Sequence, residues 1–429
     1  MTATVATARL RAIQRTALAL VVLGGVVNYI DRATLAVGNP LIRAELGLTA
    51  GDMGLLLSAF LWAYAFAQLP AGALVDRLGP RRLLTLGMTL WSVAQVLGGM
   101  VRGFGEFFAA RMLLGVGEAP QFPASARIAR DWFNVRDRGL ATGVWNCSST
   151  LGTAISAPLL TVLMLHFGWR WMFAIMGLAG LIVASLFYAV YREPRQVALT
   201  VAEQAYRTEG DESDARADPV TWAEWKRLFA FPTTWGMLVG FFGTVYVTWI
   251  YTAWLPAYLE QERHLSISRT GWVAAVPYVF GVVGSILGGR LVDWLVKLGV
   301  APMRSRKYPM AASLVLTALA TVLAAETPSN VVAVAAISVS LFLLYVSSTS
   351  AWAMPSVAAP ANCTASLGAM QNFGGYLGGA LAPTVTGFIV QATGSFVPAL
   401  LVGAVVAVAC AAGYLALVGR AIPAALAPA

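Results

Sequence analysis

Charged residues are scarce in this chain of 429 residues, at 11% of the total against roughly a quarter in an average soluble domain. A soluble protein with so few charges could not cover its own surface, whereas a protein surrounded by lipid does not need to. Hydrophobic residues make up 58% of the sequence and form long continuous runs such as 309–325 and 396–419. Continuous runs exclude a transmembrane β-barrel, whose strands alternate apolar and polar residues. We therefore expect an all-α integral membrane protein.

Cysteine and histidine are also rare. The three cysteines, Cys147, Cys363 and Cys410, are odd in number and lie in or beside apolar runs, which excludes a disulfide scaffold. The two histidines, His166 and His264, are far apart, and no metal-site spacing or phosphate-binding loop occurs. No nucleophile–base pair and no sizeable soluble domain are present to carry chemistry. We expect neither an enzyme nor a bound cofactor.

Apolar windows of about 20 residues predict twelve membrane-spanning helices. They cover 16–37, 52–74, 83–101, 104–126, 139–165, 171–191, 233–259, 271–289, 309–325, 331–356, 365–390 and 396–419.

Basic residues are distributed unevenly around these spans. Of the 29 Lys and Arg residues, 22 lie in the two termini, the central segment and every second loop, and only 5 lie in the alternate loops. The positive-inside rule then predicts a multi-pass protein of the inner (plasma) membrane with both termini in the cytoplasm. The net charge of +9 follows from this topology and does not indicate a nucleic-acid partner.

One long polar segment, 192–232, divides the chain into two halves of six spans each. We predict an N-terminal bundle at 1–191, a cytoplasmic linker at 192–232 and a C-terminal bundle at 233–429. Within the linker, the stretch TWAEWKRLFA at 221–230 spaces aromatic residues at helical intervals beside basic ones, which predicts a short helix at the membrane interface.

A loop motif occurs once in each half. Gly72-Ala-Leu-Val-Asp76-Arg77-Leu-Gly79-Pro-Arg81-Arg82 follows the second span, and a shorter copy at 289–293 follows the eighth. An acid at the end of one helix that faces arginines on the next would form a cytoplasmic gate, with Asp76, Arg77 and Arg81 as its members. The alternative is that these arginines only fix the topology.

Four charged side chains fall well inside predicted spans: Asp31, Arg32, Arg111 and Glu118. Each costs at least about 2.5–3.5 kcal/mol at the centre of a membrane helix on insertion scales, so the set needs internal partners. Two acids and two bases can neutralise one another. Ionisable residues inside a membrane usually mark a transport pathway, and a purely structural network is the alternative.

Several stretches resemble one branch of the major facilitator superfamily, the anion:cation symporters. They are Asn28-Tyr-Ile-Asp31-Arg32, RMLLGVGEAP at 111–120, WLPAYL at 254–259, NFGG at 372–375 and the loop motif. The resemblance covers nearly the whole chain. It implies twelve transmembrane helices in two six-helix bundles and the transport of sugar acids such as galactonate, glucarate and hexuronates.

The resemblance also implies residue roles. Arg32 would bind the carboxylate of the substrate, which its planar guanidinium can hold at any working pH. Asp31 and Glu118 would take up and release protons, with Arg111 as the partner of Asp31. An acid beside an arginine loses its partner when the substrate binds that arginine, and its affinity for a proton then rises. Binding of the substrate and binding of the proton are thereby coupled.

Further polar candidates would complete the substrate site. The resemblance places Tyr64, Trp352 and Asn372 at the cavity, although both aromatic residues could equally serve packing. Asn28 shares a helix face with Arg32, and Ser149 on the fifth span could line the same cavity.

We therefore predict a proton-coupled symporter that imports a small organic anion, expected to be a sugar acid, by alternating access. Its partners would be an anion with at least one carboxylate, protons and the lipid bilayer, with no nucleic acid, and it would act as a monomer. A transporter of dicarboxylates or aromatic acids, an anion exchanger and a uniporter remain alternatives within the class. A membrane enzyme and a channel or receptor are the alternatives outside it.

Overall fold

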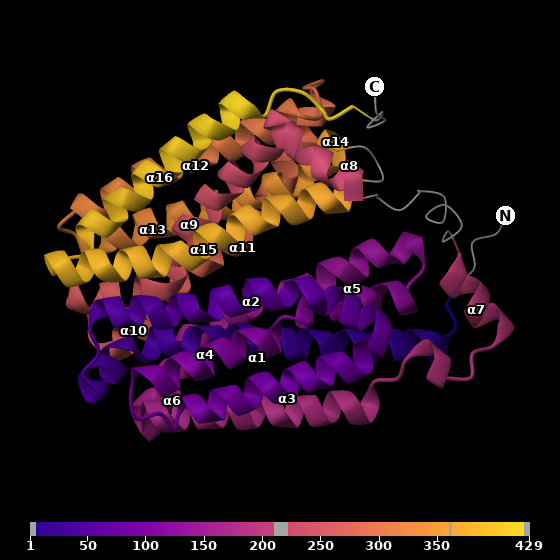
Figure 1. Cartoon of the computed structure of the whole chain (residues 1–429), viewed down its shortest axis with the longest axis horizontal. Coiled ribbons are helices and arrows are strands. Elements are labelled where there is room, and N and C mark those ends of the chain that lie inside the picture. Colours follow the sequence, from indigo (N-terminus) through magenta and orange to yellow (C-terminus); the bar gives the residue numbers. More distant parts are fainter. Residues whose placement is uncertain (1–5, 210–221, 360–362, 424–429) are drawn as a thin grey trace. The chain divides into compact units, whose positions relative to one another are not determined.

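The computed structural model describes residues 6–209, 222–359 and 363–423 (Figure 1). Every regular element among these residues is a helix, which confirms the all-α prediction. By length and composition, nine helical segments in the described ranges can cross a membrane. The protein is a multi-pass membrane protein.

The twelve predicted spans map onto these helices, and the fourth, eighth and tenth are each divided between two of them. The eighth comprises α10 (Ile267–Val273) and α11 (Ala275–Lys297), and the tenth comprises α13 (Asn330–Ala353) and α14 (Pro355–Ala358). The fifth and sixth spans are the two helical parts of α6 (Val135–Val190), which meet at a kink at Gly168, whose φ of 80° is not helical; the kink lies in the predicted gap between 165 and 171. The fourth span is divided into α4 (Phe104–Glu118) and α5 (Gln121–Trp132). The third span, α3 (Pro80–Gly98), begins with a proline followed by Arg81 and Arg82, which lower its mean hydropathy.

The chain divides into two compact units, which are described separately. The first contains residues 1–46 and 59–216. Its helices are α1 (Ala8–Leu46), most of α2 (Ala50–Leu78), α3, α4, α5, α6, the short 3-10 helix η1 (Pro194–Gln196) and α7 (Val201–Thr208). Within it α1 packs along α6, and α3 lies beside both α4 and α6 (Figure 1).

Glycines let α4 approach its neighbours closely. A Cβ atom added to Gly117 would lie 2.6 Å from the backbone nitrogen of Trp91 on α3. One added to Gly115 would contact the carbonyl oxygen of Phe60 and lie 2.9 Å from the backbone nitrogen of Tyr64, both on α2. Small residues of this kind are typical of helix contacts in membranes. They fix α4, which carries Arg111 and Glu118, against two other helices.

The second unit contains residues 47–58 and 217–429. Its helices are the first turns of α2, α8 (Trp222–Arg227), η3 (Leu228–Ala230), α9 (Pro232–Gln261), α10 (Ile267–Val273), α11 (Ala275–Lys297), α12 (Arg304–Glu326), α13 (Asn330–Ala353), α14 (Pro355–Ala358), α15 (Thr364–Thr393) and α16 (Val397–Leu417). Hydroxyl pairs join its helices, as between Thr244 and Ser347 at 2.9 Å and between Tyr251 and Thr321 at 2.8 Å. Such bonds satisfy polar groups that lipid cannot.

The predicted helix at 221–230 is present as α8 and η3, apart from Thr221, which lies outside the described residues. Leu228 is fully buried in the apolar core of the second unit. Trp225 and Phe229 are partly buried against the same core, with their ring centroids 5.2 Å apart. The segment is therefore packed onto its own unit. The acidic part of the predicted linker, 211–218, lies outside the described residues.

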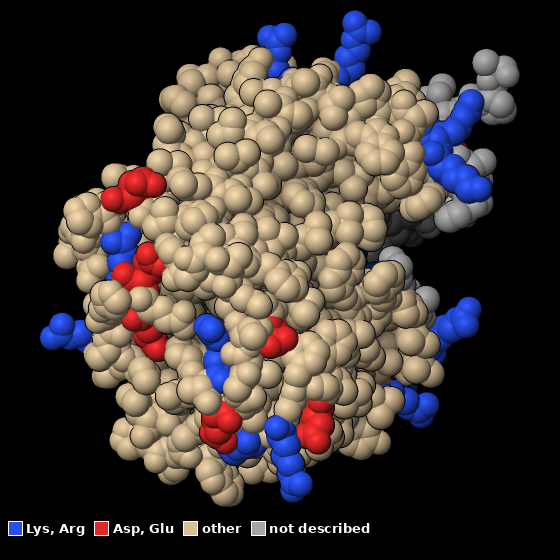
Figure 2. Space-filling view, turned by 60° about the vertical axis from the view of Figure 1, so that its left-hand side comes forward, with Lys and Arg blue, Asp and Glu red and all other residues tan. Residues whose placement is uncertain are grey.

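The surface is dominated by uncharged residues. Figure 2 shows one face on which Lys, Arg, Asp and Glu side chains occupy only small areas. Large apolar side chains are exposed on many helices, among them Phe66, Leu86 and Ile182, each more than 60% exposed. Exposed apolar side chains on this scale are expected where lipid surrounds the helices.

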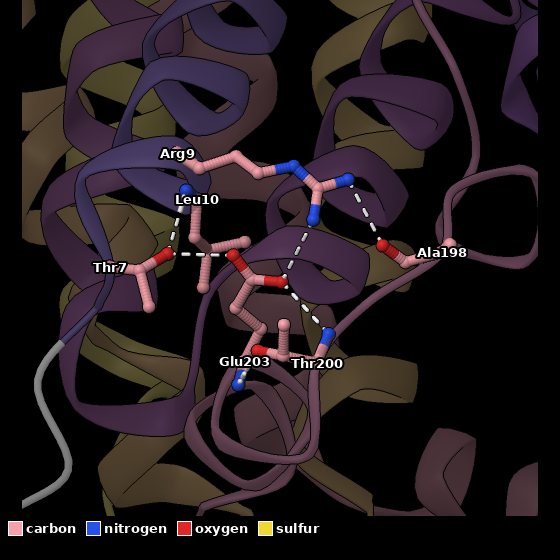
Figure 3. Close-up of polar contacts among 6 residues, drawn as sticks. All are labelled: Thr7, Arg9, Leu10, Ala198, Thr200 and Glu203. Carbon is pink, nitrogen blue, oxygen red and sulfur yellow. Dashed lines mark hydrogen bonds and ion pairs between the residues drawn. The ribbon is translucent and has the colours of Figure 1, made fainter.

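A polar contact ties the beginning of α1 to α7 (Figure 3). The carboxylate of Glu203 accepts hydrogen bonds from the Thr7 hydroxyl at 2.7 Å and from the backbone N–H of Thr200 at 3.0 Å. It also forms an ion pair with Arg9 at 3.3 Å. These donors hold the pKa of Glu203 below its ordinary value.

Candidate functional site

The centre of the first unit contains an ion pair between two helices. Arg32 on α1 donates from Nε to Oε2 of Glu118 on α4 at 2.7 Å. The Glu118 side chain is fully buried, and the Arg32 side chain is 10% exposed. A short charge-assisted hydrogen bond in such surroundings is a strong one. The structure thus brings together a predicted substrate-binding residue and a predicted proton-coupling residue.

Three aromatic rings surround the guanidinium of Arg32. Its Cζ atom lies 4.6 Å from the ring centre of Tyr29, 4.9 Å from that of Tyr64 and 5.0 Å from that of Phe60. Cation–π contacts of this length stabilise a buried cation. They also hold the planar group in one orientation, as recognition of a carboxylate requires.

Two of these rings, Tyr29 and Phe60, were not among the predicted site residues. Tyr29 lies three residues before Arg32 and Phe60 lies four before Tyr64, so helical spacing places each pair on one face. That spacing could have identified them. The Tyr29 hydroxyl lies close to Ser149 on α6, which joins this predicted residue to the group.

The second pair of predicted charges, Asp31 and Arg111, is buried more deeply. Asp31 is fully buried and Arg111 is 2% exposed. Both carboxylate oxygens of Asp31, and Nε and Nη1 of Arg111, have no hydrogen-bond partner among the described residues. Arg111 lies over the ring of Phe60, with its Cζ atom 5.3 Å from the ring centre. Both Arg111 and Glu118 are near enough to act electrostatically on Asp31.

Asn28 adds an amide to this region. It is fully buried, and neither of its amide atoms has a hydrogen-bond partner among the described residues. Buried polar groups in proteins are almost always hydrogen-bonded. Asn28, Asp31 and Arg111 are therefore buried polar side chains with hydrogen-bonding capacity that the described side chains do not use, and Asn28 lies close to Glu118.

In the second unit, two predicted substrate-binding residues share a cavity of about 270 Å³. It is lined by Trp352, Pro355, Thr364, Gly368, Ala369 and Asn372. The Trp352 ring is half exposed and packs edge-on against Phe241, with the ring centres 5.6 Å apart. The cavity thus offers an aromatic face and an amide, which is a set of groups suited to a polyhydroxylated ligand.

The predicted gate residues have different surroundings. Arg81 on α3 donates from Nη2 to the backbone carbonyl oxygen of Tyr188 at 2.7 Å. The Cζ atom of Arg81 also lies 4.4 Å from the centre of the Tyr188 ring. Arg81 therefore binds the end of α6. Arg77 is exposed, and the side chain of Asp76 lies outside the described part of the structure.

The glycine of the loop motif has a clear structural reason. Gly79 has a φ of 82°, which favours glycine, and a Cβ atom there would collide with the carboxylate of Glu193. The turn between α2 and α3 therefore needs this residue whether or not the motif forms a gate.

Comparisons with known proteins agree with this structure. The chain is 43% identical over 410 residues to a probable L-galactonate transporter of Escherichia coli (strain K12), covering 96% of this chain and 90% of that protein. It is 33% identical over 408 residues to a probable galactarate/D-glucarate transporter of Bacillus subtilis (strain 168), covering 92% of this chain and 89% of that protein. A crystal structure of a bacterial homologue of the human lysosomal transporter Spinster, inward-facing and occupied, has the same fold. Its TM-score is 0.78 at 19% identity, covering 93% of this chain and 96% of that chain.

A helical membrane protein that carries four charged side chains, Asp31, Arg32, Arg111 and Glu118, within its helices and has these relatives is a transporter and not an enzyme. The family model of the Major Facilitator Superfamily matches residues 21–383, and the chain belongs to that superfamily.

Proposed function

We propose that the protein is a proton-coupled symporter that imports a sugar acid by alternating access. It would reside in the inner (plasma) membrane with both termini in the cytoplasm, as the distribution of basic residues predicts. The observation that carries the proposal is the ion pair of Arg32 with Glu118, in which the guanidinium keeps 10% of its side-chain surface exposed while the carboxylate has none.

Arg32 would hold the carboxylate of the substrate. Its Nη2 atom is buried and has no hydrogen-bond partner among the described residues, so the guanidinium has a donor to offer. Both relatives are named as transporters of sugar acids, which supports a substrate with a carboxylate and several hydroxyls. The cavity of the second unit that Trp352 and Asn372 line has an aromatic face and an amide, groups that suit the hydroxyls of a sugar acid.

Proton coupling would follow from competition for Arg32. When the carboxylate of the substrate takes the guanidinium, Glu118 loses its ion-pair partner. An unpaired buried carboxylate is very costly, and binding a proton removes that cost. Asp31, which has no hydrogen-bond donor among the described side chains, would provide a second protonation site.

The membrane potential makes such coupling useful. An interior-negative potential opposes the entry of a monovalent anion by about 2.3 kcal/mol per 100 mV. One accompanying proton cancels this opposition, and a second one would turn the potential into a driving force.

Uptake into proteoliposomes tests the proposal. Purified protein would be reconstituted, and a proton gradient directed into the liposomes (acid outside) would be imposed. The accumulation of labelled galactonate would be measured with and without unlabelled aldonates, aldarates, hexuronates and aromatic acids as competitors. We expect accumulation above equilibrium that collapses with a protonophore and is blocked best by sugar acids. Uptake that requires internal substrate and ignores the pH gradient would instead establish an exchanger.

A further inference from the structure

A buried chain of two hydrogen bonds joins α3 to the turn of α1 that carries Asp31. Gln95 on α3 donates from Nε2 to Oγ1 of Thr34 at 2.9 Å. The Thr34 hydroxyl in turn donates to the backbone carbonyl oxygen of Asp31 at 2.8 Å. Gln95 is 1% exposed, and Thr34 and Asp31 are fully buried, so the chain is shielded from solvent along its whole length.

The bond from Gln95 is the informative one of the two. A threonine inside a helix satisfies its own hydroxyl by donating to a preceding carbonyl oxygen, and it needs no second helix for this. A glutamine amide buried among apolar helices has no such local solution and is costly unless an acceptor lies within reach. The acceptor for Gln95 is Thr34, one helical turn after Asp31, so this hydrogen bond joins α3 to α1 next to Asp31.

The same helix also fixes the position of Glu118. The backbone of Trp91, one turn before Gln95, lies against Gly117 so closely that a Cβ atom there would be 2.6 Å from the Trp91 nitrogen. Gly117 directly precedes Glu118 in the sequence. Successive turns of α3 therefore contact the segment that carries Glu118 and the segment that carries Asp31.

The carboxylate of Asp31 depends on this support. Neither of its oxygens has a hydrogen-bond partner among the described residues, so no side chain in that part of the protein holds it directly. Its place relative to Arg111 and Glu118 is set by the backbone of α1, and that backbone is bonded through Thr34 to Gln95.

We infer that Gln95 is a positioning residue for proton exchange: through Thr34 it holds Asp31 in register with Glu118, with α3 as the common frame. The inference rests on the proposed proton-coupled function. Loss of the hydrogen bond from Gln95 to Thr34 would let the Asp31 segment shift, so that the Asp31 carboxylate could form hydrogen bonds with water or with Arg111. Such contacts favour the charged form, so a higher proton concentration would be needed to drive uptake.

The test compares Gln95→Leu with a matched control, Gln14→Leu. Gln14 is also a buried glutamine of the first unit, 5% exposed, and it donates to the carbonyl oxygen of Trp132 at 2.8 Å. It lies seventeen positions before Asp31 on α1, so its loss removes a similar bond without touching the Asp31 turn. Initial rates of galactonate uptake into proteoliposomes would be measured as a function of external pH.

We expect Gln95→Leu to move the midpoint of the pH profile to lower pH by about half a unit, the effect of losing roughly one buried hydrogen bond. The KM for galactonate at saturating proton concentration should change less than twofold, and Gln14→Leu should keep the midpoint of the unmodified protein. A Gln95→Leu profile that superimposes on that of Gln14→Leu would overturn the inference.

Two substitutions of Thr34 make the test independent of how well the Gln95 variant folds. Thr34→Ser retains the hydroxyl and should keep the original profile, whereas Thr34→Val removes it and should shift the profile in the same direction as Gln95→Leu. Identical profiles for the two Thr34 variants would refute the role of the chain. If the unmodified protein shows no dependence on the pH gradient, the proposed function itself is wrong; a normal dependence with unshifted variants rejects only the role of Gln95.

Discussion

The guanidinium of Arg32 and the carboxylate of Glu118 are joined across 2.7 Å, one from α1 and the other from α4. Because the predicted anion-binding group and a predicted proton-binding group are direct partners, neither can change its ligand without affecting the other. This relationship provides the first two tests.

Arg32→Lys should impair substrate binding. An ammonium group lacks the planar fork that can bind a carboxylate by two parallel hydrogen bonds. Loss of one charge-assisted bond costs about 1.5–3 kcal/mol, which corresponds to a rise in KM of roughly tenfold to a hundredfold. Uptake kinetics in proteoliposomes measure this, with the exposed Arg102→Lys as the control. A KM within twofold of the original would remove Arg32 from the substrate site.

Glu118→Gln should separate substrate movement from proton movement. The amide cannot exchange a proton, but it retains an oxygen that can accept from Arg32. We expect accumulation driven by a pH gradient to disappear while exchange of external for internal substrate continues. Glu106→Gln is a suitable control, because Glu106 is exposed on the same helix. Retained accumulation against a gradient would show that coupling resides elsewhere.

Gly115→Ala should destabilise the first unit. The added methyl group would meet backbone atoms of Phe60 and Tyr64, which cannot rotate away, so α4 would have to separate from α2. Overpacking of this kind typically costs about 1–3 kcal/mol. Thermal unfolding in detergent should show a lower Tm. Gly105→Ala on the same helix has no atom within 4 Å of the new Cβ and should leave the Tm unchanged or slightly higher. Equal values for both variants would contradict the close packing.

The contact of Glu203 with the beginning of α1 should weaken in acid. The pKa of this carboxyl is lowered by its hydrogen bonds from Thr200 and Thr7 and by Arg9. Because this pKa is lowered, the charged carboxylate stabilises the contact fully at pH values above the ordinary pKa of about 4.3. The stabilisation is lost as the pH falls through the lowered pKa. Hydrogen–deuterium exchange, corrected for its intrinsic pH dependence, should show faster exchange over residues 8–15 at pH 3.5 than at pH 7.

Glu203→Gln should abolish most of that pH difference, because the amide does not titrate. Glu45→Gln, at the opposite end of α1, should leave it intact. If residues 8–15 exchange equally at both pH values in the unmodified protein, the carboxylate does not hold this segment.

Much of the fold follows from the sequence because lipid imposes simple rules. Long apolar runs and alternating basic loops predict the helices, and the family motifs predict the superfamily. The break inside the fourth span was not predicted, because hydropathy averages over the Glu118–Pro120 region. The break between the fifth and sixth spans was predicted at 166–170, and the structure has its kink there, at Gly168 with a positive φ.

The candidate site was predicted in part. Asp31, Arg32, Arg111 and Glu118 were identified because charges within apolar spans are costly and therefore informative. Tyr29 and Phe60 were missed, because aromatic residues are common in membrane helices and only the helical spacing of these two from Arg32 and Tyr64 distinguishes them. The hydrogen bond from Gln95 to Thr34, on which our further proposal rests, could not be predicted, because the two residues lie on different helices and their pairing depends on how those helices pack.

The Arg32–Glu118 pair also determines how ligand affinities should be interpreted. Glu118 accepts a hydrogen bond from Arg32 in the structure, so a solute that binds Arg32, as proposed, must first displace a carboxylate of the protein itself. A measured dissociation constant would then reflect the difference between the free energies with which the solute carboxylate and the Glu118 carboxylate bind Arg32, and not either value alone. Protonation of Glu118 at lower pH would then increase the affinity for every acid that competes for Arg32, whatever the structure of the rest of the acid.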